Sequence, residues 1–221
     1  MRVLLTGATG MIGQGVLREC LNAEDVSEVV AVGRTPLGQT HPKLKELVRT
    51  NLLDWSDAGE VLRGVDACFY CLGVSSGGMS EADYTRVTVD LTLALATALK
   101  AASPEVTFVF ISGASTDASE KGSVMWARVK GRAENALKAM GFRKLFLFRP
   151  GYIQPMDGIT SKTTSYRWMY AVLAPTYPLL KRLFPRMVTS TRQVGRAMLN
   201  VTRGGFSKDT LESDDINLAA G

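Results

Sequence analysis

A glycine-rich turn near the start of the chain, in the stretch LLTGATGMIGQGVL, constrains the fold most strongly. It lies between an apolar run of strand length, residues 2–6, and a run with helical spacing of apolar residues, 11–22. Glycine here allows a tight bend, close approach of a pyrophosphate to the backbone, and close packing of helix on strand. A glycine-rich turn without a ligand is the alternative. The residues expected to hold the phosphates are Gly7, Thr9, Gly10, Met11, Ile12 and Gly13.

Apolar runs of strand length alternate with longer helical patterns along the chain. The runs are apolar without clean alternation, as in strands that are covered on both faces. This order of elements predicts an α/β fold with a doubly wound parallel sheet, the Rossmann fold. We expect strands at 2–6, 28–33, 46–52, 67–73, 106–112 and 144–150, helices at 11–22, 80–102 and 124–140, and a short helix at 54–63.

The pattern changes after Pro150, where helical pieces broken by prolines dominate. We expect a single NAD(P)-binding domain over 1–221, with 1–150 as the Rossmann core and 151–221 as a small, mainly helical substrate or lid lobe. The segment 166–184 is the most apolar region outside the sheet, but its basic residues and prolines argue against a membrane-spanning helix. A buried lid helix pair or a subunit contact is favoured over attachment to a membrane surface.

The net charge of +5 raises the question of nucleic-acid binding. The basic residues are scattered, and their densest group has helical spacing with Glu134 among them, which favours a solvated face. We therefore expect no nucleic-acid partner. Cys68 and Cys71 form a CxxC in a strand-like run, where residues three apart face opposite sides, so buried core thiols are favoured over a metal clamp. The short first apolar run and the odd number of cysteines indicate a cytoplasmic protein with reduced thiols.

The second expected strand ends in AVGRT, which bears on the choice of dinucleotide. Sites for NAD usually carry a carboxylate here, whereas this chain has Gly33 and Arg34. An arginine can clamp a 2′-phosphate through two hydrogen bonds, so NADP is predicted over NAD. The alternative is a solvated loop arginine. After Leu53, Asp54 is a candidate acceptor for the adenine amino group, or else the cap of the following helix.

Motifs along nearly the whole chain resemble the short-chain dehydrogenase/reductase superfamily, in its atypical, epimerase-like NAD(P)H-binding branch. They are TGATGMIG, VGRT, NLLD, CLG, FISGAS, VKGRAE, FRPGYIQP and RQVGRAML. The resemblance implies three groups of site residues. The end of the fourth strand passes the adenine ribose, the serine after the fifth strand and the lysine of a YxxxK motif form the active site, and the RPG segment lies near the nicotinamide. These map to Cys71, Leu72 and Gly73; to Ser112 and Lys130; and to Pro150, Gly151, Tyr152 and Ile153.

The chain departs from the family pattern at the residue four before Lys130, where Trp126 replaces the tyrosine. Tyrosine has a pKa of about 10 and can exchange a proton near a cation, but an indole N–H is not a usable acid. The helix position where many relatives carry asparagine is Thr88. A second YxxxK match, 177–181, is interpreted as chance. Tyr152 is the candidate substitute acid, with a packed lobe residue as the alternative.

Two functions follow from this pattern. In the first, the protein is an NADP-dependent oxidoreductase or epimerase-like enzyme acting on a small or lipophilic carbonyl substrate. Lys130 then holds the nicotinamide ribose, Ser112 polarises the carbonyl, and Tyr152 or water supplies protons. In the second, it is a catalytically weak or inactive NADP-binding protein with a regulatory or assembly role. The sequence names neither a substrate nor a protein partner.

Overall fold

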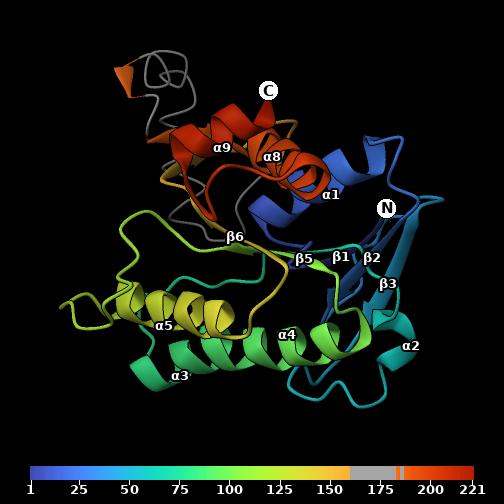
Figure 1. Cartoon of the computed structure of the whole chain (residues 1–221). Coiled ribbons are helices and arrows are strands. Elements are labelled where there is room, and N and C mark those ends of the chain that lie inside the picture. The colour runs from blue at the N-terminus through green and yellow to red at the C-terminus, as the bar shows by residue number, and fades with distance from the viewer. Residues whose placement is uncertain (160–182, 185–186) are drawn as a thin grey trace.

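A parallel sheet forms the centre of the molecule in the computed structural model, which describes residues 1–159, 183–184 and 187–221 (Figure 1). In this part of the chain its seven strands have the order β3-β2-β1-β4-β5-β6-β9, and every neighbouring pair is parallel. The predicted Rossmann fold is thus confirmed. The strands are β1 (Arg2–Thr6), β2 (Glu28–Gly33), β3 (Leu44–Val48), β4 (Ala67–Tyr70), β5 (Thr107–Ile111), β6 (Lys144–Arg149) and β9 (Thr210–Glu212).

Helices cover the sheet in two layers, one on each face (Figure 1). A short π-helical turn (Arg86–Asp90) joins α3 (Glu81–Thr85) to α4 (Leu91–Ala102), so that these two form one continuous helix, as expected over 80–102. One layer holds α1 (Met11–Asn22), α8 (Thr191–Gly204) and α9 (Ser213–Ala220). The other holds α2 (Gly59–Leu62), α3 (Glu81–Thr85), α4 (Leu91–Ala102) and α5 (Met125–Ala139).

Both faces of the sheet are buried, which explains the unbroken apolar strands. In β1, Val3 and Leu5 pack with α1 and α8, while Leu4 packs with the layer of α4 and α5. The same alternation separates two of the three free cysteines: Cys68 packs on the α4 side and Cys71 on the α1 side. The two thiols of the CxxC therefore face opposite layers, as predicted.

Three expected elements are shorter or shifted. The third strand, expected at 46–52, is β3 at Leu44–Val48, and the helix expected at 54–63 is confined to Gly59–Leu62. Asn51 Oδ1 accepts from Leu53 N at 3.0 Å, so this segment turns instead of continuing the strand. The fourth strand ends at Tyr70, since the following residues cross above the glycine-rich turn, where Leu72 N donates to the Thr6 hydroxyl.

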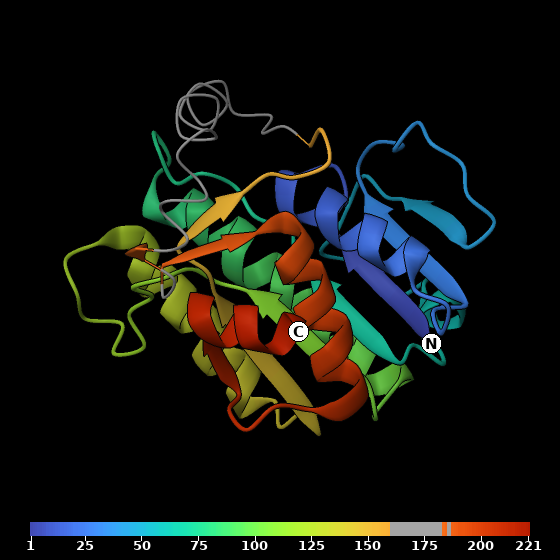
Figure 2. The same ribbon diagram turned by 90° about the horizontal axis from the view of Figure 1, so that it is seen from above.

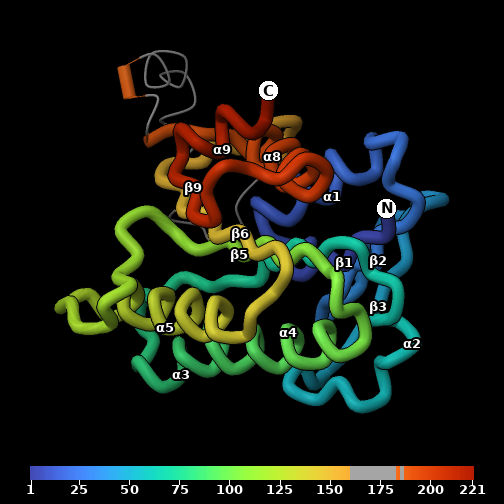
Figure 3. Tube along the Cα trace, in the orientation of Figure 1, coloured from blue at the N-terminus to red at the C-terminus, as the bar shows by residue number. Residues whose placement is uncertain are grey.

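The described parts of the segment after Pro150 contribute directly to the core. Strands β7 (Tyr152–Gln154) and β8 (Val188–Ser190) pair in parallel as a separate two-stranded sheet. Helix α8 lies along α1, as Figure 2 shows from above, and β9 extends the main sheet beside β6 (Figure 3). The close approach of α8 to α1 requires a glycine, because a Cβ at Gly15 would lie 2.6 Å from the Thr191 Cβ.

The expected division into a core over 1–150 and a lobe over 151–221 stays a prediction. Residues 160–182 and 185–186 lie outside the described part of the chain, and with them most of the apolar segment 166–184 and the second YxxxK match. Among the residues that are described, no helix has both the length and the apolar character needed to cross a bilayer.

Candidate functional site

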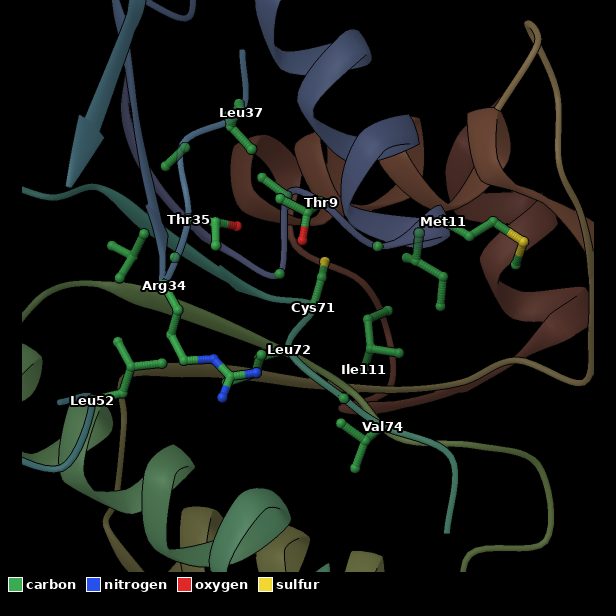
Figure 4. A pocket seen from close by; sticks show the side chains of 18 of the residues that line it. Thr9, Met11, Arg34, Thr35, Leu37, Leu52, Cys71, Leu72, Val74 and Ile111 are labelled. Carbon is green, nitrogen blue, oxygen red and sulfur yellow. The ribbon is translucent and has the colours of Figure 1, made fainter. Parts of the chain in front are cut away.

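A cavity of about 870 Å³ lies at the carboxyl ends of the parallel strands (Figure 4). It is centred where the strand order reverses between β1 and β4, the place at which doubly wound sheets bind their ligands. Its volume lies within the range typical of small-molecule and cofactor sites. The described residues in its wall that were expected from the sequence are Gly7, Thr9, Gly10, Met11, Ile12, Arg34, Cys71, Leu72, Gly73, Ser112, Lys130, Gly151 and Ile153.

Other wall residues were not expected from the sequence, although most of them flank the same strand ends. They are Ala8, Ala31, Val32, Gly33, Thr35, Leu37, Glu46, Val48, Leu52, Val74, Ser75 and Ile111. A general rule that ligands contact the residues just beyond parallel strands would have found the positions after β2 and β4. Glu46 and Val48 belong to β3 itself, whose register only the structure gives.

The glycine-rich turn has the geometry that its sequence predicts. Gly7 has φ +69°, and a Cβ there would lie 2.5 Å from the Cys71 carbonyl oxygen. A Cβ at Gly13 would lie 2.1 Å from the Gly7 oxygen, so the helix can approach the turn only with glycine at this position. Gly10 N donates to the Gly7 oxygen at 2.8 Å, which closes the turn.

The start of α1 offers unpaired donors to this cavity. Its N-cap is Gly10, no side chain caps it, and its first turn has no acidic residue. The first N–H groups of a helix lack partners within the helix and carry the positive end of its dipole. Met11 and Ile12 lie in the cavity wall at this point. The turn and the helix start together fit a pyrophosphate.

One end of the cavity is formed by residues after β2 and β3. Arg34 is exposed, and no ion pair to it occurs among the described residues. Figure 4 shows its side chain extending toward the side where Leu52 and Leu72 lie. The carboxylate of Glu46 also reaches this wall, but its Oε2 accepts from Leu37 N at 2.7 Å. Arg34 is thus the cationic group available to a ligand at this end.

The placement of Leu53 and Asp54 corrects the sequence-based expectation. Leu52, one residue earlier, lies in the cavity wall, whereas Leu53 lines a separate surface groove with Trp55. Asp54 Oδ1 accepts from Ser56 N at 3.0 Å and from its hydroxyl at 2.7 Å. These local bonds lower the pKa of Asp54. The N-cap of α2 is Ala58, without a side-chain hydrogen bond, so Asp54 does not cap the following helix either.

Lys130 forms the opposite end of the cavity, together with Ser112. From the second turn of α5, its Nζ donates to the Ser112 carbonyl oxygen at 3.0 Å and to that of Ile111 at 3.3 Å. The Phe110 ring lies beneath it, with its centroid 5.8 Å from Nζ. Burial lowers the pKa of Lys130 to about 8, although the carboxylate of Glu134 acts in the opposite direction.

The Ser112 side chain is buried and takes part in a short hydroxyl chain. Its Oγ lies 2.9 Å from Thr116 Oγ1, and Thr116 Oγ1 donates to the Gly113 carbonyl oxygen at 2.7 Å. Thr116 was not expected from the sequence. A hydroxyl residue four positions after Ser112 is the signal that could have suggested it.

Trp126 stands where the sequence places it, in the first turn of α5. The indole is half-buried beside Gly113, whose missing Cβ would lie 3.7 Å from the ring. Lys130 follows one turn later on the same helix. The indole therefore lies close to the end of β5 and to the serine that follows it, and no hydroxyl occupies that helix position.

Tyr152 does not occupy the position expected of a proton donor. Gly151, just before β7, and Ile153 within it border the cavity, and Tyr152 is absent from its described wall. Its hydroxyl donates to Gln154 Oε1 at 2.7 Å. Alternation along the strand explains this direction, because neighbouring side chains point to opposite sides. Pro150 also lies outside the wall, and its carbonyl accepts from Ala114 N at 3.0 Å.

The sheet order, the glycine-rich turn and the cavity define a Rossmann-type dinucleotide-binding protein. Residues 3–123 match the family model described as the NAD dependent epimerase/dehydratase family, and the chain belongs to this family. The atypical short-chain dehydrogenase/reductase resemblance seen in the sequence is thereby confirmed.

Curated relatives are 29–30% identical to this chain over the aligned residues. Protein fmp52, mitochondrial, of Emericella nidulans is 30% identical over 158 residues, which cover 68% of this chain and 66% of that protein. Protein HTATIP2 of Rattus norvegicus is 29% identical over 154 residues, covering 68% of this chain and 62% of that protein. The match thus spans slightly less than two thirds of these relatives' length.

Solved structures with low sequence identity share the fold. A mutated uronate dehydrogenase has a TM-score of 0.66 at 15% identity and covers 95% of this chain and 72% of its own. The enzyme WbmH of Bordetella bronchiseptica, solved in complex with NAD+, has a TM-score of 0.62 at 16% identity and covers 92% and 72%. At this level of identity the likeness concerns the architecture alone.

The names of the relatives contradict the expected cytoplasmic location. Several fungal proteins that are similar to this chain are described as mitochondrial. The sequence argument rested on an apolar run, Val3–Leu5, that is too short for a secretory signal. Mitochondrial targeting depends on amphipathic, arginine-rich segments and needs no such run, so the argument did not discriminate between the two compartments.

Proposed function

We propose that this protein is an NADP-dependent oxidoreductase or epimerase-like enzyme that acts on a small or lipophilic carbonyl substrate. The observation that carries the proposal is one cavity that joins the glycine-rich turn, Arg34 and Lys130. A dinucleotide bound with its pyrophosphate at the turn would extend in both directions along the strand ends, toward Arg34 and toward Lys130.

The choice of NADP over NAD rests on the charges at the Arg34 end. Arg34 has no ion-pair partner among the described residues, and the carboxylate of Glu46 is held by the Leu37 amide. A guanidinium there favours a 2′-phosphate, whereas a free carboxylate would favour the ribose hydroxyls of NAD. Both nucleotides fit the glycine-rich turn equally well, so Arg34 decides the preference.

The chemistry is expected at the Lys130 end of the cavity. A bound nicotinamide cofactor supplies or accepts a hydride there. Lys130, Ser112 and the backbone of Gly151 and Ile153 border that space and would orient the nicotinamide and the substrate. The apolar wall contributed by Ile111 and Ile153 favours a substrate with a hydrophobic part.

A second function, an NADP-binding regulatory or assembly protein, is favoured by one observation. Trp126 fills the position of the usual acid, and no tyrosine occurs among the described residues of the cavity wall. In such a protein the nucleotide would order the fold, and a partner would recognise the ordered state.

Nucleotide titration followed by a turnover assay separates the two functions. The protein is titrated with NADPH and NADH by calorimetry. NADPH oxidation is then followed with nonanal, benzaldehyde and cyclohexanone, and NADP⁺ reduction is followed with UDP-glucose, whose alcohol groups can donate a hydride. Turnover of one of these substrates supports the enzyme. Tight NADPH binding without turnover on the whole panel supports the regulatory protein. Failure to bind either nucleotide contradicts both.

A further inference from the structure

We propose that the Lys130 ammonium is itself the proton donor of this site, in the place of the tyrosine that Trp126 replaces. The inference rests on the proposed oxidoreductase function. It follows from comparing the groups in and beside the described cavity wall that could release a proton. The further wall hydroxyls, those of Thr9, Thr35 and Ser75, are alcohols and far weaker acids than an ammonium group.

The Ser112 proton is already committed. Thr116 has a single hydroxyl proton, and it goes to the Gly113 carbonyl oxygen, which can only accept. The contact of 2.9 Å between Thr116 Oγ1 and Ser112 Oγ must then use the Ser112 proton. Ser112 is left with lone pairs alone. It can accept a hydrogen bond from a ligand, but it has no proton to give to a carbonyl oxygen.

The remaining candidates in or beside the described wall are also excluded as acids. The Tyr152 hydroxyl donates to Gln154, and the Trp126 indole does not ionise in water. Arg34 and Glu46 belong to the opposite end of the cavity, beyond the glycine-rich turn. Burial raises the pKa of the Cys71 thiol well above its ordinary value, so this thiol would not give up its proton readily.

Lys130 provides the proton donor that remains after these exclusions. An ammonium group carries three N–H donors, and two of them point to the carbonyl oxygens of Ile111 and Ser112. The third is not used by any described residue, and Lys130 borders the cavity. The two carbonyls fix the position of Nζ, so the free N–H has a defined direction.

The charges around Lys130 tune its proton affinity. Glu134 lies one turn further along α5 and is almost fully buried, and Arg149 of β6 holds its carboxylate through two hydrogen bonds. Glu212 of β9 lies 3.9 Å from the Arg149 guanidinium. This neutralised pair does little to offset burial, which lowers the pKa of Lys130 to about 8. A lysine of this kind is suited to proton transfer near neutral pH.

The proton step balances as follows. The carbonyl carbon receives a hydride, and the dinucleotide that provides it is oxidised by one electron pair. The carbonyl oxygen takes a proton from Lys130 Nζ, so that an N–H bond breaks and an O–H bond forms. The product is an alcohol, and Lys130 is left as a neutral amine. Water returns the proton. In the reverse direction the neutral amine removes the proton from an alcohol.

Substitution of Lys130 by arginine tests the donor role, because arginine keeps the charge and the N–H groups but does not release a proton near neutral pH. Lys130→Arg should bind NADPH within about threefold of the wild-type affinity. Its kcat on the best carbonyl of the panel should fall by about 10²–10⁴-fold. The wild-type rate should decline as pH rises through about 8, and this decline should be absent from the residual rate of the variant.

Lys100 provides a matched control. Its Nζ also donates to two carbonyl oxygens, those of Met140 and Gly141, and it also lies over a phenylalanine ring, with its Nζ 5.6 Å from the Phe142 centroid. It does not border the cavity. Lys100→Arg should retain the wild-type kcat and pH profile, which separates the loss of a proton donor from a general effect of a larger cation.

A second measurement does not depend on activity. In the protein without nucleotide, lysines are labelled with acetic anhydride across a pH series, and mass spectrometry follows each amine. Lys130 should titrate near pH 8, far below the ordinary lysine value of about 10.4. Addition of NADPH should protect it. Titration at the ordinary value overturns the proposal even if Lys130→Arg fails to fold.

The outcomes distinguish this inference from the proposed function. Wild-type turnover that persists in Lys130→Arg with the same pH profile overturns the proton-donor role and leaves the oxidoreductase standing. The proton-donor role of Lys130 is also overturned, and the oxidoreductase again stands, if replacing Tyr166, Tyr170 and Tyr177 by phenylalanine removes the decline of the rate with pH. The acid would then be one of these tyrosines. A wild-type protein without turnover on the whole panel refutes the proposed function, and the donor role with it.

Discussion

Gly13 lies so close to Gly7 that a Cβ atom at position 13 would stand 2.1 Å from the Gly7 carbonyl oxygen. This contact brings the first turn of α1 against the glycine-rich turn and sets the distance between the helix N–H groups and the cavity. Gly13→Ala would force the helix away from the turn. We expect a loss of about 1–3 kcal/mol in unfolding free energy and a loss of nucleotide binding.

Gly204→Ala serves as the control for this substitution. Gly204 ends α8, and a Cβ there would meet no atom within 4 Å. Its unfolding free energy and NADPH affinity should match or slightly exceed those of the wild type. Urea denaturation and calorimetric titration check both variants. Unchanged NADPH binding in Gly13→Ala would show that the nucleotide does not use the start of α1.

Arg34→Ala should abolish the preference for NADPH over NADH. The loss of a charged, bidentate contact costs about 1.5–3 kcal/mol of binding free energy, which is roughly a ten- to hundredfold loss of affinity for NADPH. Affinity for NADH should change little, because it has no 2′-phosphate. Titration of both nucleotides into wild type and variant measures this. Arg86→Ala, which removes an exposed arginine far from the cavity wall, should leave both affinities unchanged.

Lys130→Met should stabilise the protein at neutral pH. Because burial lowers the pKa of Lys130 to about 8, the folded protein releases this proton before the unfolded chain does. Between that pH and about 10.4, the unfolded chain holds more protons, so Lys130 makes wild-type stability rise with pH. The stability of the variant lacks this rise. The difference in unfolding free energy by which the variant exceeds the wild type at pH 7 should therefore shrink by roughly 2–3 kcal/mol by pH 10.5.

Urea denaturation at a series of pH values measures this difference. Lys121→Met, at an exposed lysine, is the control and should show a gap from wild type that does not vary with pH. A constant gap for Lys130→Met as well would mean that the Lys130 ammonium is well solvated in the folded protein.

The fold and the phosphate-binding turn were predictable because their signals are local. Strand and helix periods appear among neighbouring residues. Gly7 has a positive φ, and Cβ atoms at Gly10 and Gly13 would approach the carbonyl oxygen of Gly7, only a few residues away. Arg34 was also found in this way, because the site begins where β2 ends.

Other parts of the site depend on detail that the sequence does not display. Leu52, and not Asp54, lines the cavity because Asn51 and Asp54 form a turn in which their side chains bond to nearby backbone N–H groups. A shift of one residue in such a turn changes which side chain faces the cavity. The direction of the Tyr152 hydroxyl depends on the register of β7. The Thr116 hydroxyl chain depends on how the loop after β5 folds back on itself.

Trp126→Tyr should give the site a phenolic acid one turn before Lys130. Tyrosine is smaller than tryptophan, so it fits beside Gly113 without overpacking, and the helix tolerates it. The Lys130 ammonium would lower the pKa of the new phenol, since a nearby positive charge favours phenolate. A positioned general acid is worth about 10²–10⁴-fold in rate, so carbonyl reduction with NADPH should rise within that range.

Trp126→Phe is the matched control for the new phenol, because it has the same ring without the hydroxyl. It should show no gain, so that a difference between the two variants belongs to the phenol and not to the space vacated by the indole. Lys130→Ala should weaken NADPH binding in both the wild-type and the Trp126→Tyr background. Steady-state rates of NADPH oxidation on the carbonyl panel check these outcomes. If Trp126→Tyr and Trp126→Phe instead both abolish a wild-type activity, the indole belongs to the substrate pocket as a stacking wall.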